Sequence, residues 1–181
     1  MGSTANILQI GLLVVLLLGS GFFSASETSL MSLSKIRIRY MEDEGVKGAK
    51  LVGSLIEKSS DLLSSILVGN NIVNIAATSV STSLFINIFG DGGVAIATAV
   101  MTVLVLVFGE ITPKTIAANS PEKVAVVVSK PISIIMKITK PIVWVFNLLT
   151  GVYRPDSGGW KLGNHLYKEE TIMRILFQGD S

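Results

Sequence analysis

The sequence predicts an all-α membrane protein with three transmembrane helices and short helices on the cytoplasmic side. Of 181 residues, 49% are hydrophobic and 15% are charged, against about 25% charged residues in a typical soluble domain. Charged side chains are also absent from three long runs, residues 1–26, 62–90 and 92–109. A membrane-spanning helix needs about 20 apolar residues, within a range of about 17–25, so each run is long enough to span.

These runs place the three spans at about residues 7–32, 62–89 and 92–119. The last two are separated only by a glycine-rich segment at 90–93, where we expect a tight turn. All fifteen lysine and arginine residues lie in the 34–61 loop or after Thr112. The positive-inside rule therefore places that loop and the C-terminus in the cytoplasm, with the N-terminus outside the plasma membrane. A cleaved signal peptide is disfavoured, because the first run lacks a basic start and an Ala-x-Ala-like site.

The segments between and after the spans are expected to lie at the membrane surface. Interfacial helices are predicted at about 35–58 and 120–153. The second region is interrupted by lysines and prolines, which favours short helices in the inner interface. A fourth span with snorkelling lysines is the alternative, and it would move the tail outside. Residues 1–153 then form the transmembrane domain, and residues 154–181 are expected to begin a further cytoplasmic region.

One carboxylate, that of Glu110, ends the third uncharged run. An ionisable group at membrane depth is costly and marks a functional site by default. Pro113 has no N–H, so in a helix the Gly109 carbonyl four residues earlier loses its partner. Hard cations such as Mg²⁺ prefer oxygen ligands of these two kinds. An ion pair between Glu110 and Lys114 is the structural alternative.

The other two spans also carry polar side chains on single faces. Ser20, Ser24 and Glu27 are spaced i, i+4, i+7 in the first span, and Asn70 and Asn74 are spaced i, i+4 in the second. Counting at about 1.5 Å per residue from Lys35 and from Asp61, Ser24 and Asn70 lie about 16 and 14 Å from the inner surface. We therefore expect the two faces to meet. Hydrogen bonding between helices is the alternative for the serines and asparagines, and a solvated or capping role is the alternative for Glu27.

Three motifs, one in each span, carry a family resemblance. They are Ser24-Ala25-Ser26-Glu27-Thr28, Leu67-Val68-Gly69-Asn70-Asn71-Ile72-Val73-Asn74 and Gly109-Glu110-Ile111-Thr112-Pro113-Lys114. Together they resemble the transmembrane domain of unknown function 21 in the CorC and cyclin-M family of magnesium transporters, over about residues 5–150. The resemblance implies a homodimer of three-span subunits and Mg²⁺ export coupled to Na⁺ entry. It also implies an ATP site in a cystathionine-β-synthase-type domain pair that these residues do not include.

The predicted function is Mg²⁺ transport, with the partly dehydrated ion held between the spans. Three spans per chain make a thin wall, so two subunits within the lipid bilayer are expected to close the path. The alternative is a Mg²⁺-binding sensor or scaffold without transport activity. An enzyme is not expected, because the single histidine, His165, lies in the tail, and nothing favours nucleic-acid binding. The expected metal ligands are Ser20, Ser24, Asn70, Asn74, Gly109 and Glu110, with Glu27, Gly69 and Pro113 in supporting positions.

Overall fold

The structure, a computed structural model, describes residues 2–149, with side-chain exposure for residues 4–145. The chain divides into two compact units, Met1–Val145 and Phe146–Ser181, and all candidate ligands lie in the first. Every element in the described part is helical, which confirms the predicted all-α class. In order, the elements are α1 (Gly2–Met31), α2 (Lys35–Asp43), α3 (Ala49–Ile56), α4 (Ser59–Phe89), η1 (Gly90–Gly92), α5 (Gly93–Leu104), the π-helix η2 (Val105–Ile111), α6 (Thr112–Asn119) and α7 (Pro121–Leu149).

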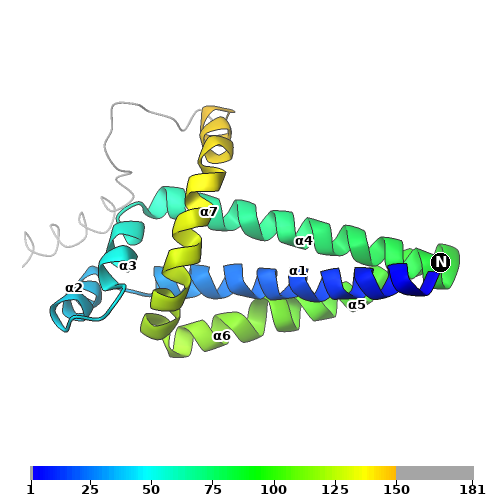
Figure 1. The fold of residues 1–181 in the computed structure, drawn as a ribbon, viewed down its shortest axis with the longest axis horizontal. Helices are drawn as coiled ribbons and strands as arrows, with labels where there is room; N and C mark the ends of the chain where they lie inside the picture. Colours follow the sequence, from blue (N-terminus) through cyan, green and yellow to red (C-terminus); the bar gives the residue numbers. More distant parts are fainter. Residues whose placement is uncertain (1, 150–181) are drawn as a thin grey trace, which may run out of the picture. The chain divides into compact units, whose positions relative to one another are not determined.

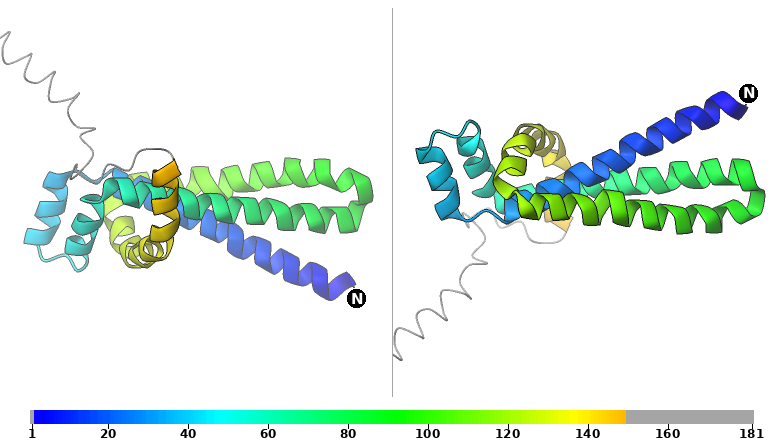
Figure 2. Two further views of the ribbon diagram at one scale, coloured as in Figure 1. Left: turned by 90° about the horizontal axis from the view of Figure 1, so that it is seen from above. Right: turned by 90° about the horizontal axis from the view of Figure 1, so that it is seen from below.

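Two stretches are long and apolar enough to cross a membrane, Thr4–Met31 and Ser59–Asn119. The second is folded back at Gly90–Gly92, so that α4 and α5 form an antiparallel hairpin (Figure 2). Glycine is required at this turn. Gly90 has a φ of 67°, and a Cβ on Gly93 would lie 2.4 Å from the Phe85 carbonyl oxygen. The turn expected at 90–93 is therefore present.

α1 contacts α4, η2 and α6. It runs antiparallel to α4, and its N-terminus diverges from the hairpin (Figures 1 and 2). Apolar side chains join α1 to the hairpin in the half that is nearer the turn. This cluster contains Leu13, Ala77, Leu84 and Met101, all buried.

A larger apolar cluster lies at the opposite end, where α1 ends and α4 begins. Leu30 from α1, Val52 from α3, Leu62 from α4 and Ile132 from α7 are completely buried in it. Full burial of an aliphatic side chain of this size contributes about 1.5–3 kcal/mol relative to leaving it exposed. The short helices α2 and α3 therefore have a firm attachment to the long ones.

α7 differs from the short helices expected over 120–153. It is one helix from Pro121 to Leu149, with Pro131 and Pro141 inside it. An interior proline removes one backbone hydrogen bond and strains the preceding turn, but packing can hold the helix together. α7 buries Ala125, Val128 and Ile132 in the larger cluster. The part of this prediction that concerns residues 150–153, and the cytoplasmic region at 154–181, lie outside the described residues.

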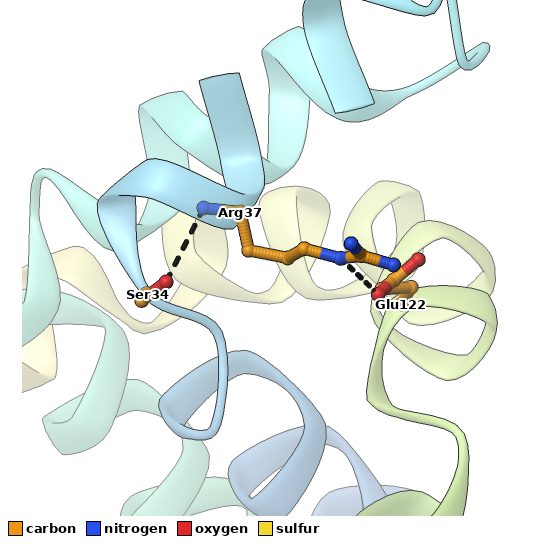
Figure 3. A network of polar contacts seen from close by, with 3 residues as sticks. All are labelled: Ser34, Arg37 and Glu122. Carbon is orange, nitrogen blue, oxygen red and sulfur yellow. Dashed lines mark hydrogen bonds and ion pairs between the residues drawn. The ribbon is translucent and has the colours of Figure 1, made fainter. Parts of the chain in front are cut away.

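An ion pair joins α2 to the start of α7. The guanidinium of Arg37 contacts the carboxylate of Glu122, and the Arg37 backbone N–H donates to Ser34 Oγ, which caps α2, at 3.2 Å (Figure 3). The hydrogen bond that Arg37 donates to the Glu122 carboxylate raises the pKa of the Arg37 side chain further above its usual range. Both side chains are partly exposed, so the pair adds little stability by itself.

Candidate metal centre

Three elements meet at Ser20, a predicted ligand one helical turn before the first motif, and the other two elements contribute residues of the second and third motifs. Ser20 of α1 is 1% exposed, and its Oγ donates to Asn70 Oδ1 of α4 across 3.4 Å, a long hydrogen bond. On the other side lies Gly109 of the π-helix, where an added Cβ would sit 2.7 Å from Ser20 Oγ. The structure therefore brings Ser20, Asn70 and Gly109 together, and only glycine fits at position 109.

Two further candidate ligands carry buried oxygens without a hydrogen-bond partner in the described part of the chain. They are Ser24 Oγ, on a side chain that is 1% exposed, and Asn74 Oδ1. An unsatisfied buried oxygen costs about 1–3 kcal/mol, so each such atom in a native fold needs an explanation. Neighbouring hydroxyls do not share this property. Ser26 Oγ, for example, donates to the Phe22 carbonyl at 2.7 Å.

These two unpaired oxygens lie on opposite sides of the Ser20–Asn70 contact. Because α1 and α4 are antiparallel, Ser24 lies one helical turn from the contact toward α2 and α3, and Asn74 lies one helical turn from it toward the Gly90–Gly92 turn. Four residues of helix advance about 6 Å, so the two residues are separated by about 12 Å along the helix axes. The polar groups form a line between α1 and α4, with the Ser20–Asn70 contact at its centre.

The helical winding changes between α5 and α6, at the third predicted motif. Residues Val105–Ile111 form a π-helix, and the Thr112 N–H donates to the carbonyl five residues earlier, that of Val107. The next amide belongs to Pro113 and has no hydrogen. In a π-helix this N–H would bond to the carbonyl five residues earlier, that of Phe108. In an α-helix it would bond to the carbonyl four residues earlier, that of Gly109. Each of these carbonyls therefore lacks the donor that position 113 would otherwise supply. Short π-helical segments inside α-helices are frequently found at functional sites.

Gly21, beside Ser20, is not one of the predicted ligands, but it shapes the site. A Cβ on Gly21 would lie 3.1 Å from both the Phe108 carbonyl oxygen and Pro113 Cγ. The small residue thus lets α1 approach the junction of the π-helix and α6 closely. The signal available in the sequence was the small-residue pattern around Ser20, in which glycine permits close helix approach.

Glu110 follows the contact residue Gly109 and is half-buried. Among the described residues it has no ion pair or side-chain hydrogen bond. Lys114, the alternative partner, instead lies with its Nζ 3.4 Å from Glu27 Oε2. That pair is a third to a half exposed and therefore weak. The carboxylate of Glu110 is consequently not committed to Lys114, and Glu27 is placed on the α6 side of α1.

Gly69, a supporting residue, has a steric role. A Cβ at this position would lie 2.4 Å from the ring of Phe23, which is itself buried. The described residues contain no group of three or more His, Cys, Asp or Glu side chains that could hold a metal. A cation between Ser20, Asn70 and Gly109 would therefore meet hydroxyl, amide and carbonyl oxygens, and Glu110 is the carboxylate next to Gly109 in the sequence.

Comparison with known proteins agrees with the motifs. The sequence matches the family described as the cyclin M transmembrane N-terminal domain over residues 11–180. A UPF0053 protein of Haemophilus influenzae is 46% identical over 139 residues, which cover 77% of this chain and 33% of the relative. The UPF0053 inner membrane protein YfjD of Escherichia coli is 46% identical over 131 residues, covering 72% and 31%. A more distant relative, the polyamine export protein of Salmonella typhimurium, is 28% identical over 141 residues, covering 71% and 32%.

The chain spans about a third of the length of these relatives. The family match, in contrast, covers most of the chain and includes all three motifs. The resemblance drawn from the motifs is therefore confirmed, and the chain belongs to the cyclin M transmembrane N-terminal domain family.

Proposed function

We propose that this domain binds Mg²⁺ between α1, α4 and the π-helix, and carries it across the plasma membrane. The observation that carries the proposal is the pair of buried, unpaired oxygens, Ser24 Oγ and Asn74 Oδ1, that flank the Ser20–Asn70 contact. A hard cation satisfies such oxygens without any N–H or O–H donor. A bound ion thus explains why the sequence retains buried oxygens that destabilise the fold when no ion is bound.

The membrane arrangement follows from charge and length. α1 forms the first span, α4 the second, and α5 with the π-helix and α6 the third. The basic α2–α3 segment then lies in the cytoplasm, and the uncharged N-terminus and the Gly90–Gly92 turn lie outside. Two such subunits form the transporting unit, because three helices alone make a thin wall around an ion path.

Mg²⁺ requires near-octahedral oxygens at about 2.0–2.1 Å, so its ligands lie within about 4.2 Å of one another. Ser24 and Asn74, about 12 Å apart, do not fit around one ion in this arrangement. We therefore assign two successive positions. The ion is first held near Ser24, Ser20 and Asn70 at the cytoplasmic side. Asn74 is the next oxygen on the way out.

Glu110 sets the charge balance. One carboxylate neutralises half of the charge of Mg²⁺, so the ion keeps several of its waters and is held weakly enough to be released. The same carboxylate neutralises a single Na⁺ completely. Na⁺ that enters down its gradient competes for these oxygens and favours the state that has released Mg²⁺ outside. Coupled export of Mg²⁺ is therefore the transport mode we propose.

A polyamine is the second candidate substrate. One relative is named a polyamine export protein, and the polar line between Ser24 and Asn74 is elongated, as a polycation with separated ammonium groups would require. The separated ammonium groups of a polyamine would each need a balancing charge, whereas the candidate ligands include a single carboxylate, that of Glu110. Mg²⁺ is therefore the substrate that we favour over a polyamine.

Purified protein in liposomes distinguishes these possibilities. With an outward Na⁺ gradient across vesicles loaded with a Mg²⁺ indicator, wild-type protein should produce a Mg²⁺ flux that Glu110→Gln abolishes. Thr98→Val is the matched control, because Thr98 Oγ1 bonds to its own helix at 2.9 Å and is exposed. Flux of radiolabelled spermidine without Mg²⁺ flux would instead establish the polyamine. Mg²⁺ binding without flux of either would establish a sensor.

A further inference from the structure

α7 has a second apolar surface that residues 4–145, the part with described side chains, leave exposed. The packed side of this helix includes Ala125 and Ile132, both 0% exposed. Val127, Ile134 and Ile138 are 74%, 59% and 67% exposed. They are spaced seven and four residues apart and so form one continuous stripe. We call Val127, Ile134 and Ile138 the outer stripe of α7.

A row of lysines lies along one edge of the outer stripe. Lys123, Lys130 and Lys137 recur every seven residues, which keeps them on one side of the helix, and all are exposed. Among the described residues none of them forms an ion pair, and the acidic residue of α7, Glu122, is paired with Arg37. The edge therefore carries a positive charge that the described part of the chain does not balance.

The position of α7 fits a surface lying along a membrane. α7 runs across α1 and α4, near the end where α1 stops and α4 begins (Figure 1). If the long helices cross the bilayer, α7 lies roughly in its plane at the cytoplasmic side. Its outer stripe then reaches hydrocarbon at the depth where its lysines reach headgroups.

We propose that the lysine edge of α7 selects anionic phospholipids of the inner leaflet, which cover the outer stripe with their acyl chains. An anionic lipid supplies both partners that this surface lacks, hydrocarbon for the stripe and negative charge for the lysines. A second copy of α7 would also supply an apolar surface, but its lysines would repel those of the first copy. The inference rests on the membrane placement in the proposed function and is independent of the transported ion.

Trp144 allows a direct test, because it lies on α7 and is half exposed. In a Trp160→Phe background it is the remaining tryptophan of the chain. The full chain is reconstituted in phosphatidylcholine vesicles that contain brominated phosphatidylglycerol or, separately, brominated phosphatidylcholine. Bromine quenches nearby tryptophan, so the ratio of the two quenching curves gives the preference of α7 for the anionic lipid.

We expect brominated phosphatidylglycerol to quench Trp144 preferentially. Lys130→Gln/Lys137→Gln should reduce the preference by about fivefold for each lysine, and added salt should also reduce it. Lys47→Gln/Lys50→Gln, which removes the same charge from the α2–α3 segment, should leave it unchanged.

Equal quenching by the two lipids in the wild type would overturn the proposal, as would an equal loss in both double variants. Quenching by neither lipid would show that protein covers the outer stripe, and would overturn it too. None of these outcomes depends on measuring Mg²⁺ flux, so this test is separate from the test of transport.

Discussion

Ser24→Ala tests whether an ion is the reason for the unpaired oxygens. Ser24 Oγ is buried without a partner, so removing it also removes a desolvation penalty of about 1–3 kcal/mol. Without Mg²⁺ the variant should be as stable as the wild type or more stable. A gain of about 1 kcal/mol corresponds to about 2–4 °C in a domain of this size. With Mg²⁺ the order should reverse, because a ligand has been lost. A tenfold loss of affinity removes about 1.4 kcal/mol of ion-dependent stabilisation at saturation.

The chain offers a matched control two residues away. Ser26 is also completely buried on α1, but its Oγ is bonded to the Phe22 carbonyl at 2.7 Å. Ser26→Ala should lower stability by about 0.5–1.5 kcal/mol, the value of one hydrogen bond, and leave the Mg²⁺ effect intact. Thermal unfolding in detergent over a Mg²⁺ series measures both quantities. The reasoning is refuted if Ser24→Ala behaves like Ser26→Ala, with lower stability and an unchanged Mg²⁺ shift.

Three other substitutions examine neighbouring parts of the account. Gly109→Ala places a Cβ 2.7 Å from Ser20 Oγ, so thermal unfolding should show a loss of stability of about 1–3 kcal/mol together with loss of Mg²⁺ binding. The control is Gly11→Ala, whose Cβ meets nothing within 4 Å and which should gain about 0.5–1 kcal/mol of stability. Equal stabilities of the two variants would contradict the close contact at Gly109. Pro113→Ala restores an N–H that can bond to a freed carbonyl, so stability without Mg²⁺ should hold or rise while the Mg²⁺-dependent shift in unfolding temperature shrinks; an unchanged shift would remove the carbonyl from the ligands. Asp91→Cys should react with an impermeant thiol reagent from outside the cell and Lys47→Cys should not, and the opposite labelling would reverse the orientation.

The sequence was informative wherever a physical constraint acts locally. Glycine at 90–93 predicted the turn because the backbone there needs a positive φ, and the i, i+4 spacing of Ser20 and Ser24 placed both on one face. Depth, counted from Lys35 and Asp61, indicated that the polar faces of α1 and α4 face one another, and the Ser20–Asn70 contact lies between those faces. These inferences needed no knowledge of how the helices pack.

Features that depend on the direction or winding of packed helices were not accessible. Depth counting put Ser24 beside Asn70, but in antiparallel helices successive polar residues move apart, so Ser24 and Asn74 lie on opposite sides of the contact. The π-helix around Gly109 lies where Gly21 lets α1 approach closely. No local sequence pattern predicts a π-helix at that position. Packing likewise holds α7 helical through Pro131 and Pro141, which by local rules predict breaks.

The position of the ion itself is the central claim, and Mn²⁺ can locate it. Mn²⁺ accepts the same octahedral oxygen ligands as Mg²⁺, and its anomalous scattering marks its place in a crystal of the purified protein. The account predicts a peak between α1, α4 and the π-helix, about 2–2.5 Å from oxygens of Ser20, Ser24 or Asn70, that Mg²⁺ displaces and Glu110→Gln weakens. A peak elsewhere in the protein, with no peak among these oxygens, would contradict it.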